Sequence, residues 1–166
     1  MNKIEIFKKF FFKEYNLIYI AIISFLFFLD RITKIKIIDK QLLDEKKIFI
    51  NDYLNFDLIW NTGIGFGLLS QNANTLYHLI TLVIFFVIII LFYITFKPTS
   101  LDSLSFTFVL GGAIGNFYVR VVYFAVPDFI DIHISDYHWF TFNVADIFIS
   151  FGIISIILKD IVLKKK

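Results

Sequence analysis

The sequence predicts a mainly α-helical membrane protein: a bundle of four transmembrane helices with a small extracytoplasmic β-sheet region in the first outer loop. The 166-residue chain is 58% hydrophobic and only 18% charged, whereas soluble domains are about 45–50% apolar with about a quarter of their residues charged. Four apolar stretches have roughly the 20 residues that a helix needs to cross a hydrocarbon core ~30 Å thick. The first long connection contains two short strand-like runs.

Composition also excludes several classes of protein. Disorder requires low hydrophobicity and high net charge, and this chain has neither. Because it contains no Cys, disulfides, thiol nucleophiles and Cys-based metal sites are excluded. A net charge of +2 is too small to indicate a nucleic-acid partner, so membrane lipids are the surroundings that we expect.

The apolar stretches define a single integral membrane domain over residues 1–166. The predicted spans are 17–38, 76–96, 104–126 and 140–158. The outer loop 39–75 separates the first two spans. Its runs 48–50 and 54–60 are the expected strands, and the second run ends at a turn formed by Asn61, Thr62 and Gly63.

Basic residues fix the expected orientation. Lysines precede the first span, lie between the second and third spans, and follow the fourth: Lys3, Lys8, Lys9, Lys13, Lys97, Lys159 and Lys164 to Lys166. The short segment 135–139 on the other side has no Lys or Arg. The positive-inside rule therefore places both termini in the cytoplasm. The first apolar run ends in Asp30 and Arg31 without a small-residue cleavage site, which indicates a retained helix.

Polar residues within or beside the apolar spans are the candidate functional residues, because a charge at the bilayer centre costs about 2.5–3.5 kcal/mol. They are Asp30, Arg31, Thr33, Lys34, Asn116, Arg120, Asp128, Asn143 and Asp146.

The expected topology brings these residues to one level. Asp30 lies some 13 residues above the inner start of its span, roughly 20 Å at 1.5 Å per residue. Arg120 and Asp128 belong to the outer part and outer end of the third span. Asp146 lies about six residues, roughly 9 Å, below the outer start of the fourth span. All of them are therefore expected near the outer surface.

Two carboxylic acids at such a site have a specific chemistry. If Asp128 and Asp146 approach each other in a medium of low dielectric constant, repulsion prevents both from ionising. Such a pair can hold a water, deprotonate it for attack on an amide carbonyl and protonate the leaving amine. Pro127 is expected to end the third helix directly before Asp128.

Other interpretations of these residues stay open. Asp128 alone could be a surface acid, and Asp146 could be a structural partner of Arg120 or Lys34. The Asn residues could join helices through hydrogen bonds, the glycines four apart in the third span could mark close helix packing, and the histidines could be structural: Asn116, Asn143, Gly111, Gly115, His78, His133 and His138.

Five motifs, taken together and in order, carry a resemblance to a known family. They are 30–34 (DRITK), 61–66 (NTGIGF), 111–116 (GGAIGN), 127–131 (PDFID) and 142–146 (FNVAD). The sequence resembles lipoprotein signal peptidase (signal peptidase II), a four-helix aspartic endopeptidase of the bacterial inner (cytoplasmic) membrane, over nearly its whole length.

The resemblance implies an activity and a set of site residues. Asp128 and Asp146 would form the catalytic dyad. The expected substrate-binding residues are Asn61, Asn116, Arg120 and Asn143, and the expected supporting residues are Asp30, Lys34 and Gly63. The implied substrate is a prolipoprotein whose Cys carries diacylglycerol, cleaved on the N-terminal side of that Cys. Neither a metal nor a cofactor is implied.

The sequence departs from the family pattern at a few positions. Val119 stands at a normally acidic position before Arg120, residues 64 and 65 are Ile and Gly in place of two alanines, and Pro127 replaces Val. The alternatives to an active peptidase are a non-catalytic homologue that binds lipidated peptides, motivated by Val119, and a small transporter, motivated only by the buried charges.

Overall fold

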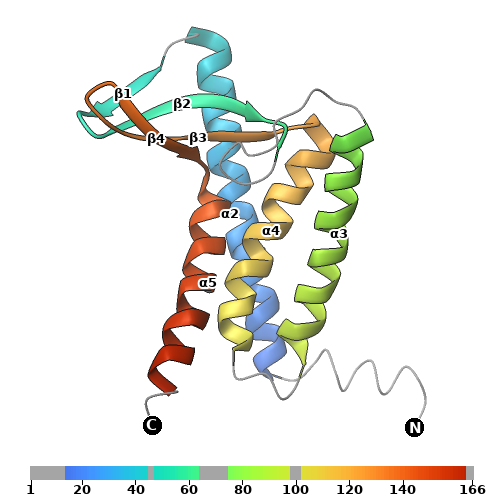
Figure 1. Cartoon of the computed structure of the whole chain (residues 1–166). Helices are drawn as coiled ribbons and strands as arrows, with labels where there is room; N and C mark the ends of the chain where they lie inside the picture. The colour runs from blue at the N-terminus through green and yellow to red at the C-terminus, as the bar shows by residue number, and fades with distance from the viewer. Residues whose placement is uncertain (1–13, 45–46, 64–74, 98–101, 164–166) are drawn as a thin grey trace, which may run out of the picture.

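The protein is described by a computed structural model that covers residues 14–44, 47–63, 75–97 and 102–163. Four helices of this part stand side by side, and a β-sheet lies across one end of them (Figure 1). Residues 64–66 of the second motif lie outside the described residues, as do the lysines at positions 3, 8, 9, 13 and 164–166 that were used for orientation.

Each predicted span overlaps one helix. The helices are α2 (Glu14–Asp44), α3 (Thr75–Phe96), α4 (Ser103–Tyr123) and α5 (Val144–Leu163). The first helix continues six residues past the predicted end at 38, since α2 ends at Asp44. The third ends three residues before 126, because Phe124 adopts a left-handed conformation with φ 57°. The fourth begins at Val144 and not at 140.

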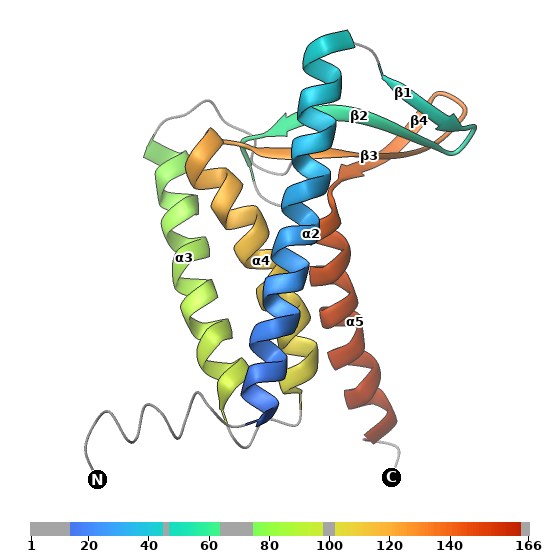
Figure 2. The same ribbon diagram turned by 180° about the vertical axis from the view of Figure 1, so that it is seen from behind.

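Helix α4 lies at the centre of the bundle and packs against α2, α3 and α5 (Figures 1 and 2). Its glycines allow the close approach. A Cβ added at Gly111 would lie 2.9 Å from Leu26 Cδ1 of α2, and one added at Gly112 would lie 2.5 Å from the Ala145 carbonyl oxygen of α5. A Cβ at Gly115 would lie 2.8 Å from an Asp30 carboxylate oxygen. The interpretation of Gly111 and Gly115 as close-packing positions is confirmed.

The sheet is antiparallel and joins two segments that are distant in sequence. Its strands, in spatial order, are β1 (Ile48–Asn51), β2 (Leu54–Asn61), β3 (Val126–Ile134) and β4 (Tyr137–Phe142). The β2–β3 pairing connects the loop after α2 to the segment after α4. The sheet therefore joins segments from two of the helix connections at one end of the bundle.

The prediction of a sheet confined to the first outer loop was incomplete, because β3 and β4 come from residues 126–142. The expectation that Pro127 ends a helix was wrong, because Pro127 lies in β3 opposite Trp60. The cause is an inverted alternation along β3, whose buried residues Asp131 and His133 are polar while Ile132 and Ile134 are exposed. From the sequence alone, the mixture of apolar and polar residues in β3 resembles the end of an apolar helix followed by a polar loop.

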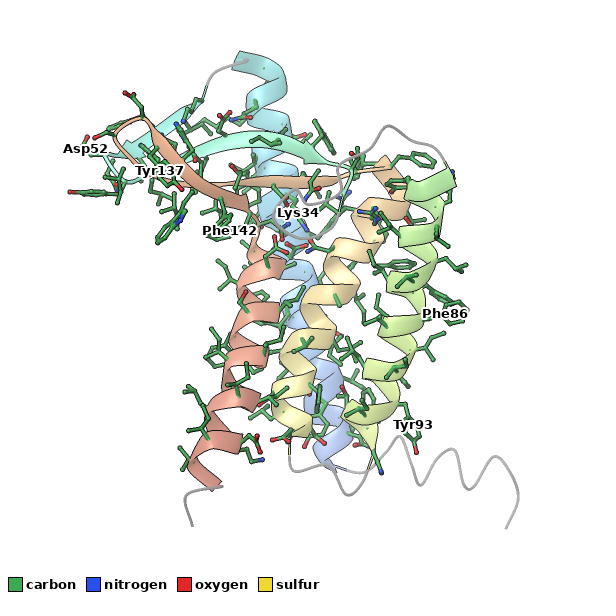
Figure 3. The ribbon with its side chains drawn as sticks, in the orientation of Figure 1. Lys34, Asp52, Phe86, Tyr93, Tyr137 and Phe142 are labelled. Atoms are coloured by element: carbon green, nitrogen blue, oxygen red, sulfur yellow. The ribbon has the colours of Figure 1, made fainter. Side chains whose placement is uncertain are left out.

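The bundle presents an apolar surface. Two of the described helices, α3 over Tyr77–Phe96 and α4 over Ser103–Tyr123, are long and apolar enough to cross a membrane by length and composition. The exposed side chains of α3 include Leu79, Val83, Phe86, Ile90 and Tyr93, and Phe86 and Tyr93 point away from the bundle (Figure 3). Such a surface suits contact with lipid.

Candidate active site

A cavity of about 340 Å³ lies where the helices meet the sheet. Its polar lining comes from different elements and consists of Asn61, Asn116, Arg120, Asp128, Asp146 and Ser150. Its apolar lining includes Ile84, Phe117, Ile149 and Ile153. Two carboxylic acids therefore share one largely apolar cavity.

Asp128 lies on β3 and is only 3% exposed. Its Oδ2 accepts a hydrogen bond from Asn61 Nδ2 at 2.9 Å, and its Oδ1 accepts one from Asn143 Nδ2 at 2.6 Å. Burial and the negative charge of Asp146 together raise the pKa of Asp128 to about 6, although the two amide hydrogen bonds oppose the shift. Asp128 can therefore hold a proton close to neutral pH.

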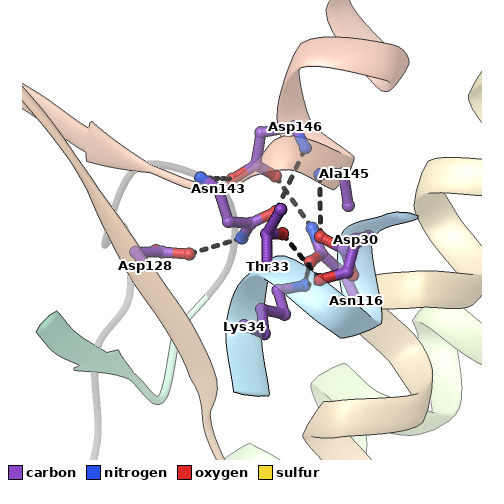
Figure 4. Close-up of polar contacts among 8 residues, drawn as sticks. All are labelled: Asp30, Thr33, Lys34, Asn116, Asp128, Asn143, Ala145 and Asp146. Atoms are coloured by element: carbon purple, nitrogen blue, oxygen red, sulfur yellow. Dashed lines mark hydrogen bonds and ion pairs between the residues drawn. The ribbon is translucent and has the colours of Figure 1, made fainter. Parts of the chain in front are cut away.

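Asp146 lies in the first turn of α5, where Asn143 caps the helix. The Asn143 backbone N–H donates to Asp146 Oδ2 at 3.0 Å, and the Asp146 N–H donates to Asn143 Oδ1 at 3.2 Å. This reciprocal pair has the form of a capping box. Asn116 Nδ2 donates to the other carboxylate oxygen at 2.8 Å. The Asp146 carboxylate is therefore held from two elements (Figure 4).

A buried ion pair on α2 supports this arrangement (Figure 4). Lys34 Nζ lies 2.7 Å from Asp30 Oδ2 and also donates to Asn116 Oδ1 at 2.6 Å. Asp30 Oδ1 accepts from the Ala145 backbone N–H at 2.9 Å. Because Asn116 in turn donates to Asp146, the ion pair orients this amide towards the acid.

Arg120 holds the end of β2. Its guanidinium donates to the carbonyl oxygens of Thr62 and Gly63 and to Thr81 Oγ1, and its Cζ lies 4.5 Å from the centre of the Tyr77 ring. Tyr77 also donates to the Arg120 carbonyl oxygen. The hydrogen bonds that the structure gives Arg120 therefore go to the backbone and a hydroxyl, and they fix the turn that follows Asn61.

The structure brings the expected site residues together. Asn61, Asn116 and Arg120 line the cavity beside the two acids, whereas Asn143 is fully buried and contacts both acids. Asp30, Lys34 and Gly63 contact these residues. The interpretation of Asp128 as a surface acid is excluded by its burial.

Sequence reasoning missed Tyr77 and Thr81 on α3, which both contact Arg120. In a chain with 23 Phe and 8 Tyr, nothing in the sequence position of Tyr77 distinguishes it from the other aromatic residues. Among the described residues, one group of three His and Asp side chains that could share a ligand gathers away from the cavity, namely Asp131, His133 and His138 on the β3–β4 hairpin.

Residues 22–162 match the family model described as Signal peptidase (SPase) II. The chain is similar to a lipoprotein signal peptidase of Pelagibacter ubique (strain HTCC1062), with 42% identity over 167 positions that cover 100% of this chain and 96% of that protein. A second relative, a lipoprotein signal peptidase of Anaplasma phagocytophilum (strain HZ), is 38% identical over 84% of this chain and 88% of its own length.

The fold has matches among solved structures. One, a bacterial membrane enzyme determined by the in meso method at 2.3 Å resolution, superposes with a TM-score of 0.66 at 28% identity, covering 86% of this chain and 87% of that chain. Another, determined by the same method at 1.9 Å, has a TM-score of 0.62 at 30% identity, covering 85% and 90%. The resemblance drawn from the five motifs is confirmed, and the chain belongs to the signal peptidase II family of membrane peptidases.

Proposed function

We propose that this protein is an aspartic endopeptidase that removes signal peptides from prolipoproteins bearing a diacylglyceryl Cys, and that Asp128 and Asp146 are its catalytic dyad. The observation that carries the proposal is that these two acids, from β3 and α5, line one cavity and are both bound by Asn143.

The mechanism follows from two acids that share a proton. The ionised carboxylate takes a proton from a water molecule while the oxygen of that water attacks the amide carbonyl carbon of the substrate. The protonated carboxyl donates a hydrogen bond to that carbonyl oxygen and later gives its proton to the leaving amine as the C–N bond breaks. The raised pKa of Asp128 supports this scheme, because the pair then keeps a proton at a pH where an ordinary Asp has lost it.

The surroundings of the acids fit a lipidated substrate. Ile84, Phe117, Ile149 and Ile153 form an apolar wall of the cavity, which suits the acyl chains next to the scissile bond. Asn61 and Asn116 are the candidates to bind the substrate backbone. Arg120 fixes the 62–63 turn, and Asn143 holds the two acids.

The four helices would cross the bacterial inner membrane, with both chain termini in the cytoplasm and the sheet on the outer side. Support comes from the arrangement in Figure 1, where α2 begins and α5 ends at the end of the bundle opposite the sheet. The acids then lie near the outer interface, where a lipid-anchored chain presents its scissile bond.

The test is cleavage of a diacylglyceryl-modified prolipoprotein by the purified chain in detergent, with the unlipidated precursor as the control substrate. Asp128→Asn and Asp146→Asn should each lower the rate by at least about 100-fold, the range in which general acid–base groups contribute. Asp102→Asn is the matched control, because Asp102 pairs with Lys159 at the other end of α4 and α5. More than about a tenth of the parent rate in either dyad variant would contradict the proposal.

A second candidate function is motivated by Val119, which is fully buried where the family pattern has an acid. A non-catalytic homologue would bind the lipidated peptide without cleaving it. Binding of the lipidated precursor by the parent chain, with no product after prolonged incubation, would favour this candidate over the peptidase.

A further inference from the structure

The β3–β4 hairpin carries a cluster of side chains that the proposed mechanism does not use. Asp131, His133 and His138 each offer an oxygen or ring nitrogen, and these three atoms lie within 4.8 Å of one another. Asp131 and His133 are buried in β3, whereas the His138 side chain is 50% exposed. The cluster is therefore accessible to solutes through His138.

An irregularity in strand pairing assembles the cluster. Asp131 pairs with Thr141 and Ile132 pairs with Phe140, so regular pairing would place His133 opposite Trp139. The register shifts by one residue after Ile132, and His133 pairs with His138 instead. Because a one-residue shift moves a side chain to the other face of a sheet, the bulge brings His138 to the face that carries Asp131 and His133.

Both imidazoles point an edge at the same carboxylate. His138 Nδ1 lies 2.8 Å from Asp131 Oδ1, and His133 Nδ1 lies 3.8 Å from Asp131 Oδ2. The two rings stack, with centres 5.1 Å apart. Ligand atoms of a tetrahedral zinc ion are roughly 3.3 Å apart, given bonds of about 2.0–2.1 Å. The shared oxygen Asp131 Oδ2 lies 3.0 Å from His138 Nδ1 and 3.8 Å from His133 Nδ1, on either side of that value.

Asn55 orients His133 for this role. The Asn55 amide satisfies its neighbours when its Nδ2 donates to the Leu54 carbonyl at 3.2 Å and its Oδ1 accepts from His133 Nε2 and Lys47 Nζ, each at 3.2 Å. In this orientation His133 can carry its proton on Nε2 and keep a lone pair on Nδ1, which lies 3.8 Å from Asp131 Oδ2. Metal-ligating histidines are commonly fixed by a hydrogen bond of this kind on the other ring nitrogen.

We propose that Asp131, His133 and His138 form a Zn²⁺ site with three protein ligands, completed by a water. Two imidazole nitrogens with one carboxylate oxygen suit zinc, whereas Mg²⁺ and Ca²⁺ require oxygen ligands. Bound zinc would cross-link β3 and β4 at the outer end of the sheet, three residues along β3 from Asp128.

Lys47 gives the proposal a distinctive signature. Its Nζ lies 2.8 Å from Asp131 Oδ2, so it donates to the same carboxylate and places a positive charge beside the site. The ammonium occupies one acceptor position of the carboxylate and opposes a cation there. Removing the Lys47 ammonium should therefore strengthen zinc binding at this site.

The experiment is a Zn²⁺ titration of the purified full chain, prepared in detergent without a polyhistidine tag, by competition with a fluorescent chelator. The parent chain should bind one Zn²⁺, and His138→Ala and His133→Ala should each weaken binding by at least about tenfold. Lys47→Gln should tighten it severalfold. His78→Ala, on α3, is the matched histidine control and should bind as the parent does. Zn²⁺ should also raise the melting temperature of the parent and of His78→Ala but not that of His138→Ala, and Mg²⁺ should raise none of them.

Three results would overturn the proposal. They are failure of the parent chain to bind Zn²⁺, equal affinity in His138→Ala and His78→Ala, and equal stabilisation by Mg²⁺. His138 is half exposed, so its variant is expected to fold, and its melting temperature without metal checks this.

Discussion

Asn143 forms hydrogen bonds with both candidate catalytic acids. Its Nδ2 donates to Asp128 on β3, its backbone N–H donates to Asp146 on α5, and its Oδ1 accepts from the Asp146 N–H. Because Asn143 is fully buried, water cannot take over these bonds. Asn143 therefore links the two acids directly.

Replacing Asn143 with Ala should lower the rate of prolipoprotein cleavage by about ten- to 1000-fold and destabilise the fold by about 1–2 kcal/mol, the usual cost of losing an N-cap. Cleavage and thermal melting measured on the same preparation check this. Asn51→Ala, at the exposed end of β1 beside the β1–β2 turn, is the matched control and should change neither. A variant with normal kcat would show that Asn143 does not position the dyad.

The raised pKa of Asp128 makes stability depend on pH. An unfolded Asp ionises near its ordinary value of 3.8, whereas folded Asp128 ionises at about 6. Between these values the folded chain binds more protons than the unfolded chain, so the free energy of unfolding falls as pH rises. At neutral pH the raised pKa of Asp128 lowers the free energy of unfolding by about 3 kcal/mol.

Asp128→Asn removes this titration. The melting temperature of the variant relative to the parent should therefore increase from pH 4 to pH 7, even though the variant is inactive. Parallel melting curves of the two proteins in detergent across this range measure the difference. A constant difference would mean that the folded-state pKa of Asp128 is not raised.

At the level of elements, the sequence predicted the helices better than the sheet. Long apolar runs identify α3 and α4 directly, and the short runs 48–50 and 54–60 correspond to β1 and β2. Strands β3 and β4 were missed because Ile132 and Ile134 of β3 face outward while its polar residues Asp131 and His133 face inward. Phe140 and Phe142 of β4 likewise continue into the apolar sequence of α5.

Much of the candidate site could be predicted by counting residues along spans. Counting residues predicted that Asp30, Arg120, Asp128 and Asp146 lie at a similar depth along the spans. This prediction agrees with their positions around the cavity and in its supporting ion pair. Hydrogen-bond partners could not be predicted in this way. They depend on the β2–β3 register, which brings Asn61 to Asp128, and on the Arg120 contacts with α3.

Arg120 connects three elements, since its guanidinium on α4 binds the turn after β2 and Thr81 on α3. Arg120→Ala would leave buried backbone carbonyls without donors and free the turn that positions Asn61. We expect at least a tenfold loss of cleavage activity and a destabilisation of about 2–4 kcal/mol.

Arg120→Lys should lose activity as Arg120→Ala does, because a single ammonium cannot replace the two guanidinium nitrogens that donate to neighbouring carbonyl oxygens. Lys97→Ala, after α3 at the end of the bundle opposite the sheet, is the control and should behave as the parent. Equal cleavage rates in Arg120→Ala and Lys97→Ala would show that the turn does not need this anchor.

At the scale of the whole molecule, the cavity lies at the junction of the bundle and the sheet. Helices supply Asn116, Arg120 and Asp146, and strands supply Asn61 and Asp128. Neither layer alone contains both acids. The β2–β3 pairing therefore determines the geometry of the site as much as the helix packing around α4 does.

The proposed topology can be tested directly because the chain contains no Cys. Asp136→Cys lies in the turn between β3 and β4, and Lys97→Cys follows α3 at the other end of the bundle. In intact spheroplasts a membrane-impermeant maleimide should label Asp136→Cys at once and Lys97→Cys only after detergent is added, because a helix of about 20 residues separates the two sides. The cysteine-free parent controls for background, and retained cleavage activity controls for correct folding. Labelling of Lys97→Cys in intact spheroplasts would reverse the assigned orientation, and labelling of both variants there would contradict a bundle in which α3 and α4 cross the membrane.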